Sequence, residues 1–186
     1  SDGPLRRTRR AVIDRVNIQC PAKVNLFLEV TGRRKDGYHS LATLFAKINL
    51  FDTLEIETRP PGPVELEPAE DPSGKTPPGR DNLVFRAAEV FRKAFRVRCG
   101  VLIRLRKNIP VGAGLGGGSS DAAGALLGLT RVFQIPERRA RPVLRRLAAG
   151  LGADVPFFLR SEALCIGKGI GDKLRPVKAD KAHPWM

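Results

Sequence analysis

A glycine-rich run at positions 110–120 contains the residue types best suited to chemistry. Five glycines stand at positions 112, 114, 116, 117 and 118. Glycine has no Cβ, so it adopts positive φ angles and lets backbone amides approach a ligand closely. A strand-like segment precedes the run. An Ala- and Leu-rich segment follows it, and the first amides of such a helix are unpaired at the positive end of its dipole. This order predicts an anion cradle suited to a nucleotide phosphate rather than a merely flexible loop.

Two common nucleotide-binding motifs do not fit this run. A Walker A motif requires Lys at position 118, where this sequence has Gly. Residues 112–117 match the GxGxxG pattern, but a Rossmann fold needs a second strand that ends in an acidic residue about 20 positions later. The acidic residue near that distance, Glu137, is expected to open a helix instead. We therefore expect a different kind of nucleotide-binding fold.

Two charged residues elsewhere in the chain could serve a reaction at a bound phosphate. Lys23 stands two positions before Asn25 in a strand-like run, so both side chains are expected on one side of the strand. Asp154 stands among apolar residues at 151–158, where a carboxylate must be paired or functional. For each residue taken alone, the alternative is a solvated strand face for Lys23 and a helix cap for Asp154.

The overall composition sets the class of protein. The sequence has 186 residues, of which 42% are hydrophobic, enough for one generous domain or two small ones with a real core. No uninterrupted apolar window of about 18 residues exists, so we expect no membrane span. The three cysteines and two histidines show no zinc-site spacing, and we expect buried thiols in a reducing compartment.

The charge of the chain raises the alternative of nucleic acid binding. Lys and Arg number 33 against 19 Asp and Glu, which gives a formal net charge of +14. Basic residues attract phosphate backbones. RNA-binding modules also interleave aromatic residues for base stacking, whereas aromatic residues here make up only 6% and follow core-like spacing. The composition therefore disfavours nucleic acid as a partner without excluding it.

Periodicity predicts the elements that must position these groups. Alternating apolar residues predict strands at 12–19, 24–30, 53–58, 101–106 and 163–166. The apolar run 41–50 fits either a strand or a helix. Amphipathic or apolar spacing predicts helices that begin after a cap at 81–82, at Ser119, and after Pro136, the last of them ending at Gly150. Seven prolines make 59–80 a loop or a short edge hairpin, and 152–159 reads as a loop. Strands followed by helices, without strict alternation, predict an α+β sandwich.

Four motifs together resemble the GHMP family of small-molecule kinases. They are PAKVNLFL at 21–28, DGYH at 36–39, PVGAGLGGGSSDAA at 110–123 and GADVPFF at 152–158. The resemblance extends over residues 17–176, nearly the whole chain. It implies an α+β fold of the GHMP kinase N-terminal domain type, a two-layer sandwich like domain 2 of ribosomal protein S5. It also implies a kinase that uses ATP and Mg²⁺.

The resemblance further implies roles for particular residues. Lys23 and Asp154 would be the catalytic pair, with Asp154 accepting the proton of the substrate hydroxyl and Lys23 stabilising the developing alkoxide. The residues that would hold the small-molecule substrate are Asn25, Tyr38 and His39, with Tyr38 stacked on a cytosine. The residues that would hold ATP are Pro110, Val111, Gly112, Ala113, Gly114, Leu115, Gly116, Gly117, Gly118, Ser119, Ser120, Asn82, Leu83 and Lys107. Mg²⁺ would lie near Ser119 and Ser120, without a cage made of protein side chains alone.

Within the family, the motifs are most similar to members that phosphorylate the 2-hydroxyl of cytidine diphosphate methylerythritol in non-mevalonate isoprenoid synthesis. The resemblance implies a cytoplasmic transferase whose partners are ATP and that small molecule, with no membrane or nucleic acid partner. Three alternatives stay open: another GHMP kinase, an inactive fragment of one, and an RNA-binding module of the same fold.

Three regions are expected along the chain. Residues 1–10 are expected to form a basic, disordered arm, and residues 11–178 the ATP-binding and catalytic domain. Residues 179–186 are expected to begin a second domain or to form a tail. In the family, a second domain closes the substrate cleft, and we expect that domain to be missing from these 186 residues.

Overall fold

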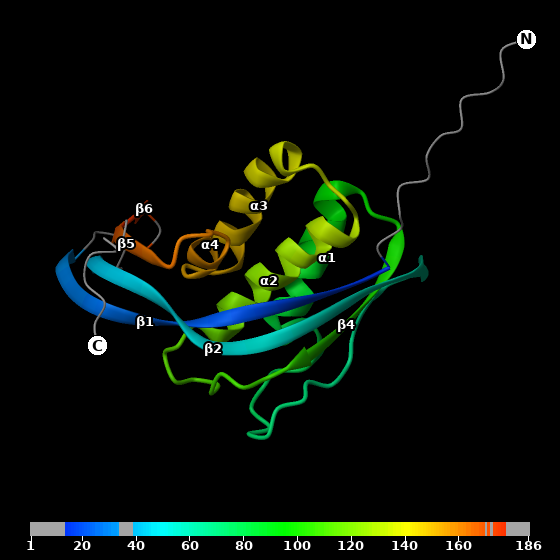
Figure 1. The fold of residues 1–186 in the computed structure, drawn as a ribbon, viewed down its shortest axis with the longest axis horizontal. Helices are drawn as coiled ribbons and strands as arrows, with labels where there is room; N and C mark the ends of the chain where they lie inside the picture. The colour runs from blue at the N-terminus through cyan, green and yellow to red at the C-terminus, as the bar shows by residue number, and fades with distance from the viewer. Residues whose placement is uncertain (1–13, 34–38, 170, 172, 178–186) are drawn as a thin grey trace, which may run out of the picture.

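The computed structural model describes residues 14–33, 39–169, 171 and 173–177. These residues form two layers, a sheet with helices on one of its faces (Figure 1). The strands are β1 (Arg15–Arg33), β2 (His39–Pro61), β3 (Val64–Leu66), β4 (Cys99–Arg106), β5 (Leu164–Gly169) and β6 (Lys173–Pro176). The helices are α1 (Leu83–Phe95), α2 (Gly117–Val132), α3 (Glu137–Leu151) and α4 (Val155–Phe158), with a 3₁₀ turn at Gly79–Asp81. The α+β sandwich predicted from the sequence is confirmed.

Strand β2 is the centre of the sheet. It pairs antiparallel with β1 along its length, and with β4 and β5 on its other side. The strand order is β3-β4-β2-β5-β6, with β1 joined to β2 off this path. Strand β3 is parallel to β4, and β6 is antiparallel to β5. Figure 1 shows β1 and β2 passing beneath the helices and extending to β5 and β6 at one end.

The sequence predicts a break between 12–19 and 24–30 that the structure does not contain. Strand β1 is continuous from Arg15 to Arg33. Proline lacks a backbone N–H and would be expected to interrupt the ladder. A register shift between Pro21 and Ala22 accommodates it, so the strand continues. The run 41–50, left ambiguous by its composition, is part of β2.

The core lies between α2 and the sheet. Fully buried apolar side chains from both layers meet there, including Leu54, Ile56, Ile103, Leu126 and Leu129. Two glycines of α2 face the strands, because a Cβ on Gly124 would overlap Cys20 Sγ and one on Gly128 would lie 2.5 Å from Ile56 Cδ1. The missing side chains let α2 lie directly on the sheet, which fixes the position of its first turn.

Helix boundaries follow the predicted signals closely at α1 and less closely elsewhere. Helix α1 begins after Asn82, whose Oδ1 accepts a hydrogen bond from the Val84 amide at 2.8 Å, which confirms the predicted cap. Helix α2 begins at Gly117 rather than at Ser119, so the last two glycines of the run are helical. Helix α3 extends one residue past Gly150.

Three short elements differ from the prediction. The proline-rich segment 59–80 contains the edge strand β3, which pairs parallel to β4 rather than forming a hairpin. The segment 152–159, predicted as a loop, contains the single turn α4. Strand β6 has no counterpart among the predicted elements. In the described part of the chain, no helix is both long and apolar enough to cross a membrane.

Candidate active site

The glycine-rich loop connects the end of β4 to the start of α2. Gly112, Gly114 and Gly116 have φ angles of 81°, 75° and 72°, a region that other residues rarely adopt. Helix α2 then begins at Gly117, so its first unpaired amides point toward the loop. The predicted order of strand, glycine loop and helix N-terminus is therefore present and forms a concave backbone surface suited to an anion.

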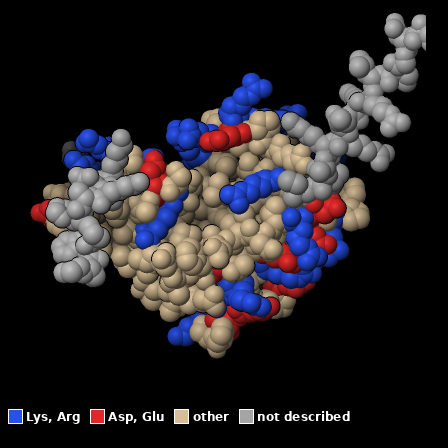
Figure 2. Space-filling view, in the orientation of Figure 1, with Lys and Arg blue, Asp and Glu red and all other residues tan. Residues whose placement is uncertain are grey.

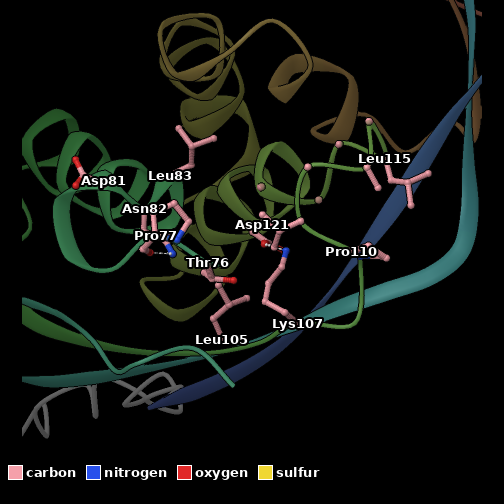
Figure 3. Close-up of a pocket in the computed structure, with 17 residues that line it drawn as sticks. Thr76, Pro77, Asp81, Asn82, Leu83, Leu105, Lys107, Pro110, Leu115 and Asp121 are labelled. Carbon is pink, nitrogen blue, oxygen red and sulfur yellow. Dashed lines mark hydrogen bonds and ion pairs between the residues drawn. The ribbon is translucent and has the colours of Figure 1, made fainter. Parts of the chain in front are cut away.

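A cavity of about 260 Å³ lies along this loop (Figure 3). Most of the residues predicted to hold ATP line it together: positions 110–118 with Asn82, Leu83 and Lys107. Ser119 and Ser120 are not among the lining residues. The cavity also has lining residues that the sequence did not indicate, namely Thr76, Pro77, Asp81, Leu105 and Asp121. Thr76 and Pro77 come from the proline-rich segment, whose sequence carries no nucleotide-binding signal.

Asn82 joins the start of α1 to the rim of this cavity. Its Oδ1 caps the helix, and its Nδ2 donates a 2.9 Å hydrogen bond to the Pro77 carbonyl. The side chain therefore uses both polar atoms in fixing the cavity wall.

Lys107 is buried at the back of the cavity and is held by two carboxylates. Its Nζ donates a hydrogen bond to Asp52. It donates a second one, 2.7 Å long, to Asp121 (Figure 3). Burial lowers the pKa of Lys107, but the charges and hydrogen bonds of Asp121 and Asp52 outweigh it, so the pKa is raised overall. Burial is also the main cause that raises the pKa of Asp121 to about 7, against the opposing effect of Lys107. Lys107 lines the cavity, yet its ammonium group is bound to these two carboxylates.

Lys23 and Asp154 come together beside the glycine loop. Lys23 Nζ lies 3.6 Å from Asp154 Oδ2. The Lys23 side chain is buried, whereas that of Asp154 is 31% exposed. Asp154 occupies the residue before α4, but its side chain makes no capping hydrogen bond to that helix. The helix-cap alternative therefore does not explain this carboxylate, and its ion pair with Lys23 does.

A chain of hydrogen bonds orients Lys23. Its Nζ donates to Asn25 Oδ1 at 2.7 Å, and Asn25 Nδ2 donates to Thr43 Oγ1 at 2.7 Å. Thr43 in turn donates to the Phe27 carbonyl. Lys23 and Asn25 do share one side of β1, as period two predicts, but the structure gives Asn25 two protein partners.

The other two residues predicted to hold the substrate are Tyr38 and His39. Tyr38 lies outside the described residues. His39 opens β2, where its backbone pairs with Arg33, and its side chain lies outside the description.

Ser119 and Ser120 occupy the first turn of α2. Ser120 is buried, and its Oγ has no hydrogen-bond partner among the described residues. An unpaired hydroxyl at a helix start fits the predicted place of a phosphate and its Mg²⁺. Among the described residues, no three His, Cys, Asp or Glu side chains lie together as a metal-binding group.

Some basic side chains of the surface have acidic partners. Figure 2 shows Lys and Arg side chains around the rim of this view, with Asp and Glu between them. On the sheet, Arg104 pairs with Glu55, Glu57 and Glu67, and Arg15 pairs with the first two of these. The acidic residues that follow position 52 thus pair with nearby arginines on the sheet.

The sequence is similar to a family model and to curated proteins that share one name. Residues 82–162 match the family model for the GHMP kinases N terminal domain. The chain is 43% identical over 168 residues to 4-diphosphocytidyl-2-C-methyl-D-erythritol kinase of Delftia acidovorans, covering 90% of this chain and 56% of that protein. It is 47% identical over 155 residues to the protein of the same name from Methylacidiphilum infernorum, covering 83% of this chain and 52% of the relative. The chain thus spans about half the length of the curated relatives it matches.

Solved structures agree with these sequence matches. A crystal structure of 4-(cytidine 5'-diphospho)-2C-methyl-D-erythritol kinase superposes with a TM-score of 0.75 at 44% identity, covering 87% of this chain and 55% of the other. Homoserine kinase from Cytophaga hutchinsonii has a TM-score of 0.65 at 18% identity, covering 91% of this chain and 53% of the other. The second likeness concerns the fold alone.

Proposed function

Because this chain carries the N-terminal domain of the GHMP kinase family, we propose that it binds ATP and catalyses transfer of the γ-phosphoryl group to a hydroxyl of a small molecule. The observation that carries this proposal is the 3.6 Å approach of Lys23 Nζ to Asp154 Oδ2 beside the glycine loop. A phosphate cradle, a buried cation and a partly exposed carboxylate are the groups that phosphoryl transfer needs in one place.

In the proposed reaction, the oxygen of the substrate hydroxyl attacks the γ-phosphorus in line. A new P–O bond forms as the bond from the γ-phosphorus to the β–γ bridging oxygen breaks, and ADP leaves. Asp154 accepts the hydroxyl proton, and Lys23 stabilises the negative charge that develops on the attacking oxygen. The backbone amides of residues 112–118 would donate hydrogen bonds to the phosphate oxygens. Mg²⁺ would be held with the phosphates near Ser119 and Ser120, where it would neutralise charge.

For the substrate we propose 4-diphosphocytidyl-2-C-methyl-D-erythritol, phosphorylated at its 2-hydroxyl in isoprenoid precursor synthesis. The support is the name shared by relatives that are 43% and 47% identical and by a solved structure that is 44% identical. Asn25, Tyr38 and His39 are the residues proposed to hold this substrate. A cytoplasmic location is part of the proposal, because the reaction draws on ATP.

The test is an assay of the purified protein with ATP, Mg²⁺ and this substrate. We expect ADP to form together with one new phosphomonoester in the ³¹P spectrum, and little or no product with mevalonate or homoserine. Asp154→Asn should lower the transfer rate by about 10²- to 10⁴-fold, the usual contribution of a general base. The matched control is Glu162→Gln, a carboxylate two residues before β5 that pairs with Arg160, which should leave the rate unchanged.

Two results would contradict the proposal. If Asp154→Asn transferred the phosphoryl group at the wild-type rate, Asp154 would not be the general base. Faster transfer to mevalonate or homoserine would support the kinase activity but contradict the proposed substrate.

A further inference from the structure

Three buried charged residues from three elements meet beneath the glycine-rich loop. Asp52 belongs to β2, Lys107 follows β4, and Asp121 belongs to the first turns of α2. We call them the buried triad. Their side chains are 0%, 5% and 2% exposed, and Lys107 Nζ bridges the two carboxylates. Figure 3 shows Lys107 reaching from the end of β4 to Asp121 at the back of the cavity.

The triad holds the segment that enters the loop. Asp52 Oδ1 accepts hydrogen bonds from the backbone amides of Asn108 at 2.6 Å and Ile109 at 2.8 Å. Asn108 Nδ2 donates to the Phe51 carbonyl at 2.8 Å. The residues before Pro110 are therefore tied to β2.

The same triad holds the segment that leaves the loop. Asp121 lies in α2, and its Oδ2 accepts from Lys107 at 2.7 Å. The helix start is packed against the loop entry, because a Cβ on Gly117 would lie 3.0 Å from Ile109 Cγ2 and 3.1 Å from Lys107 Nζ. The two ends of the 110–116 loop are thus fixed to one buried group, which sets the distance the loop must span.

Stability alone does not account for three buried charges. Well-packed apolar residues of similar volume usually stabilise a fold as well as a buried ion pair does, or better. A charged cluster instead demands one geometry, because any displacement leaves a buried charge without its partner. What the triad adds at this place is a fixed position for the loop.

We propose that Asp52, Lys107 and Asp121 are positioning residues for the nucleotide, because they fix the span of the glycine-rich loop and so the placement of its backbone amides. This inference rests on the proposed function, since it concerns the same phosphate cradle. It assigns Lys107 a different role from contact with adenine, since its ammonium group is bound to two carboxylates. Lys107 acts on ATP through the loop.

The experiment compares Asp121→Asn and Lys107→Met with wild type, and uses Arg106→Met as the matched control. Arg106 is the last residue of β4, next to Lys107, and its exposed side chain pairs with Glu70. Titration calorimetry measures the affinity for ATP and for adenosine, and hydrogen exchange reports on residues 110–118 and on α3. Both triad variants should bind ATP about tenfold to a hundredfold more weakly, as expected for displaced positioning groups. Adenosine affinity should change by less than about twofold, because adenosine has no phosphate for the loop to hold.

The exchange data separate loop placement from general destabilisation. Amides of 111–118 should exchange faster in the triad variants while those of α3 stay as in wild type, and Arg106→Met should match wild type throughout. An equal loss of ATP and adenosine affinity would overturn the proposal in favour of a direct base contact. Unchanged loop exchange and ATP affinity in folded variants would also overturn it.

Two further arms keep the test decisive. If Lys107→Met does not fold, Asp52→Asn takes its place, since the amide oxygen can still accept from Asn108 and Ile109 while the charge is lost. If wild type binds no ATP, the proposed function fails, and loop exchange in the variants still decides whether the triad positions the loop.

Discussion

The backbone amide of Lys23 donates a 2.9 Å hydrogen bond to the carbonyl of Leu115. Strand β1 and the glycine-rich loop are therefore joined at the residue that carries the proposed catalytic ammonium group. Gly116 follows Leu115, and a Cβ at this position would lie 3.1 Å from Lys23 Cγ and 3.0 Å from Phe158 Cζ. The loop can approach Lys23 this closely only because position 116 lacks a side chain.

The first prediction concerns Gly116→Ala. Its φ of 72° is strained for alanine, and the new methyl group would press on Lys23 and Phe158. We expect a loss of about 1–3 kcal/mol in the free energy of unfolding, measured by urea titration. ATP affinity should fall about tenfold, because Leu115 and the neighbouring amides are displaced.

Gly118→Ala is the matched control for stability. Gly118 is helical, and the nearest described atom to a Cβ there is Leu83 Cδ1 at 3.7 Å. Its unfolding free energy should equal or exceed that of wild type, because alanine favours a helix. Equal stabilities for the two variants would show that the loop moves freely away from Lys23.

The second prediction concerns Thr43, the residue behind Asn25. Thr43→Val keeps the shape of a buried side chain but removes the acceptor for Asn25 Nδ2 and the donor to Phe27. Asn25 then holds Lys23 less firmly, and we expect phosphoryl transfer to slow about tenfold with ATP affinity nearly unchanged. Steady-state kinetics and calorimetry measure the two quantities.

Thr58→Val is the control for this prediction. Thr58 lies on the same strand, and its exposed hydroxyl makes a 3.4 Å contact with the Asp14 carbonyl. This variant should keep the wild-type rate. If Thr58→Val also lowered the transfer rate, or if Thr43→Val kept the wild-type rate, the hydrogen bonds through Thr43 and Asn25 would not be what orients Lys23.

Local signals predicted the layers of the fold and most of the cavity lining. The glycines, the Asn82 cap and the alternation of β4 depend on near neighbours in sequence, so they could be recognised without a structure. The alternation of β2 also carried a signal that was missed. Asp52 occupies the same inward side as Leu54 and Ile56, where a carboxylate must have a buried partner.

Other features depend on contacts that no single segment contains. Two strands were predicted at 12–19 and 24–30, but pairing with β2 along both halves of β1 joins them and outweighs the missing N–H of Pro21. Thr76 and Pro77 line the cavity only because the proline-rich segment folds back on the start of α1. The partners of Lys107 likewise come from elements more than ten residues away in sequence.

The third prediction concerns the pH dependence of the loop that carries Thr76. Asp71 accepts hydrogen bonds from the hydroxyl groups of Thr76 and Ser73 and from three backbone amides in 73–76. These hydroxyl groups, Thr76 first, lower the pKa of Asp71 well below its usual range. The carboxyl carbon of Asp71 should therefore titrate at lower pH in the folded protein than in a peptide of residues 69–77.

The sign of the effect on stability follows from this direction. A carboxylate whose pKa is lowered on folding stabilises the fold fully at pH values above its unfolded-state pKa of about 4. This contribution is lost as the pH falls from that value toward the lower pKa of the folded state. The difference in unfolding free energy between wild type and Asp71→Asn should thus be largest near pH 6 and shrink toward pH 3. A difference that grows as the pH falls would refute the assignment.

The fourth prediction concerns the approach of α2 to the sheet, on which the whole site depends. Gly124→Ala would overlap Cys20 Sγ and lie 3.2 Å from Leu54 Cδ1, and such overpacking should destabilise the fold by about 1–3 kcal/mol. Gly150→Ala in α3 has no described atom within 4 Å and should stabilise it by about 0.5 kcal/mol. Adding Cys20→Ala to Gly124→Ala should recover part of the loss, because it removes the overlapping sulfur. If urea titrations show strictly additive losses in this double variant, the two residues do not limit how closely α2 packs.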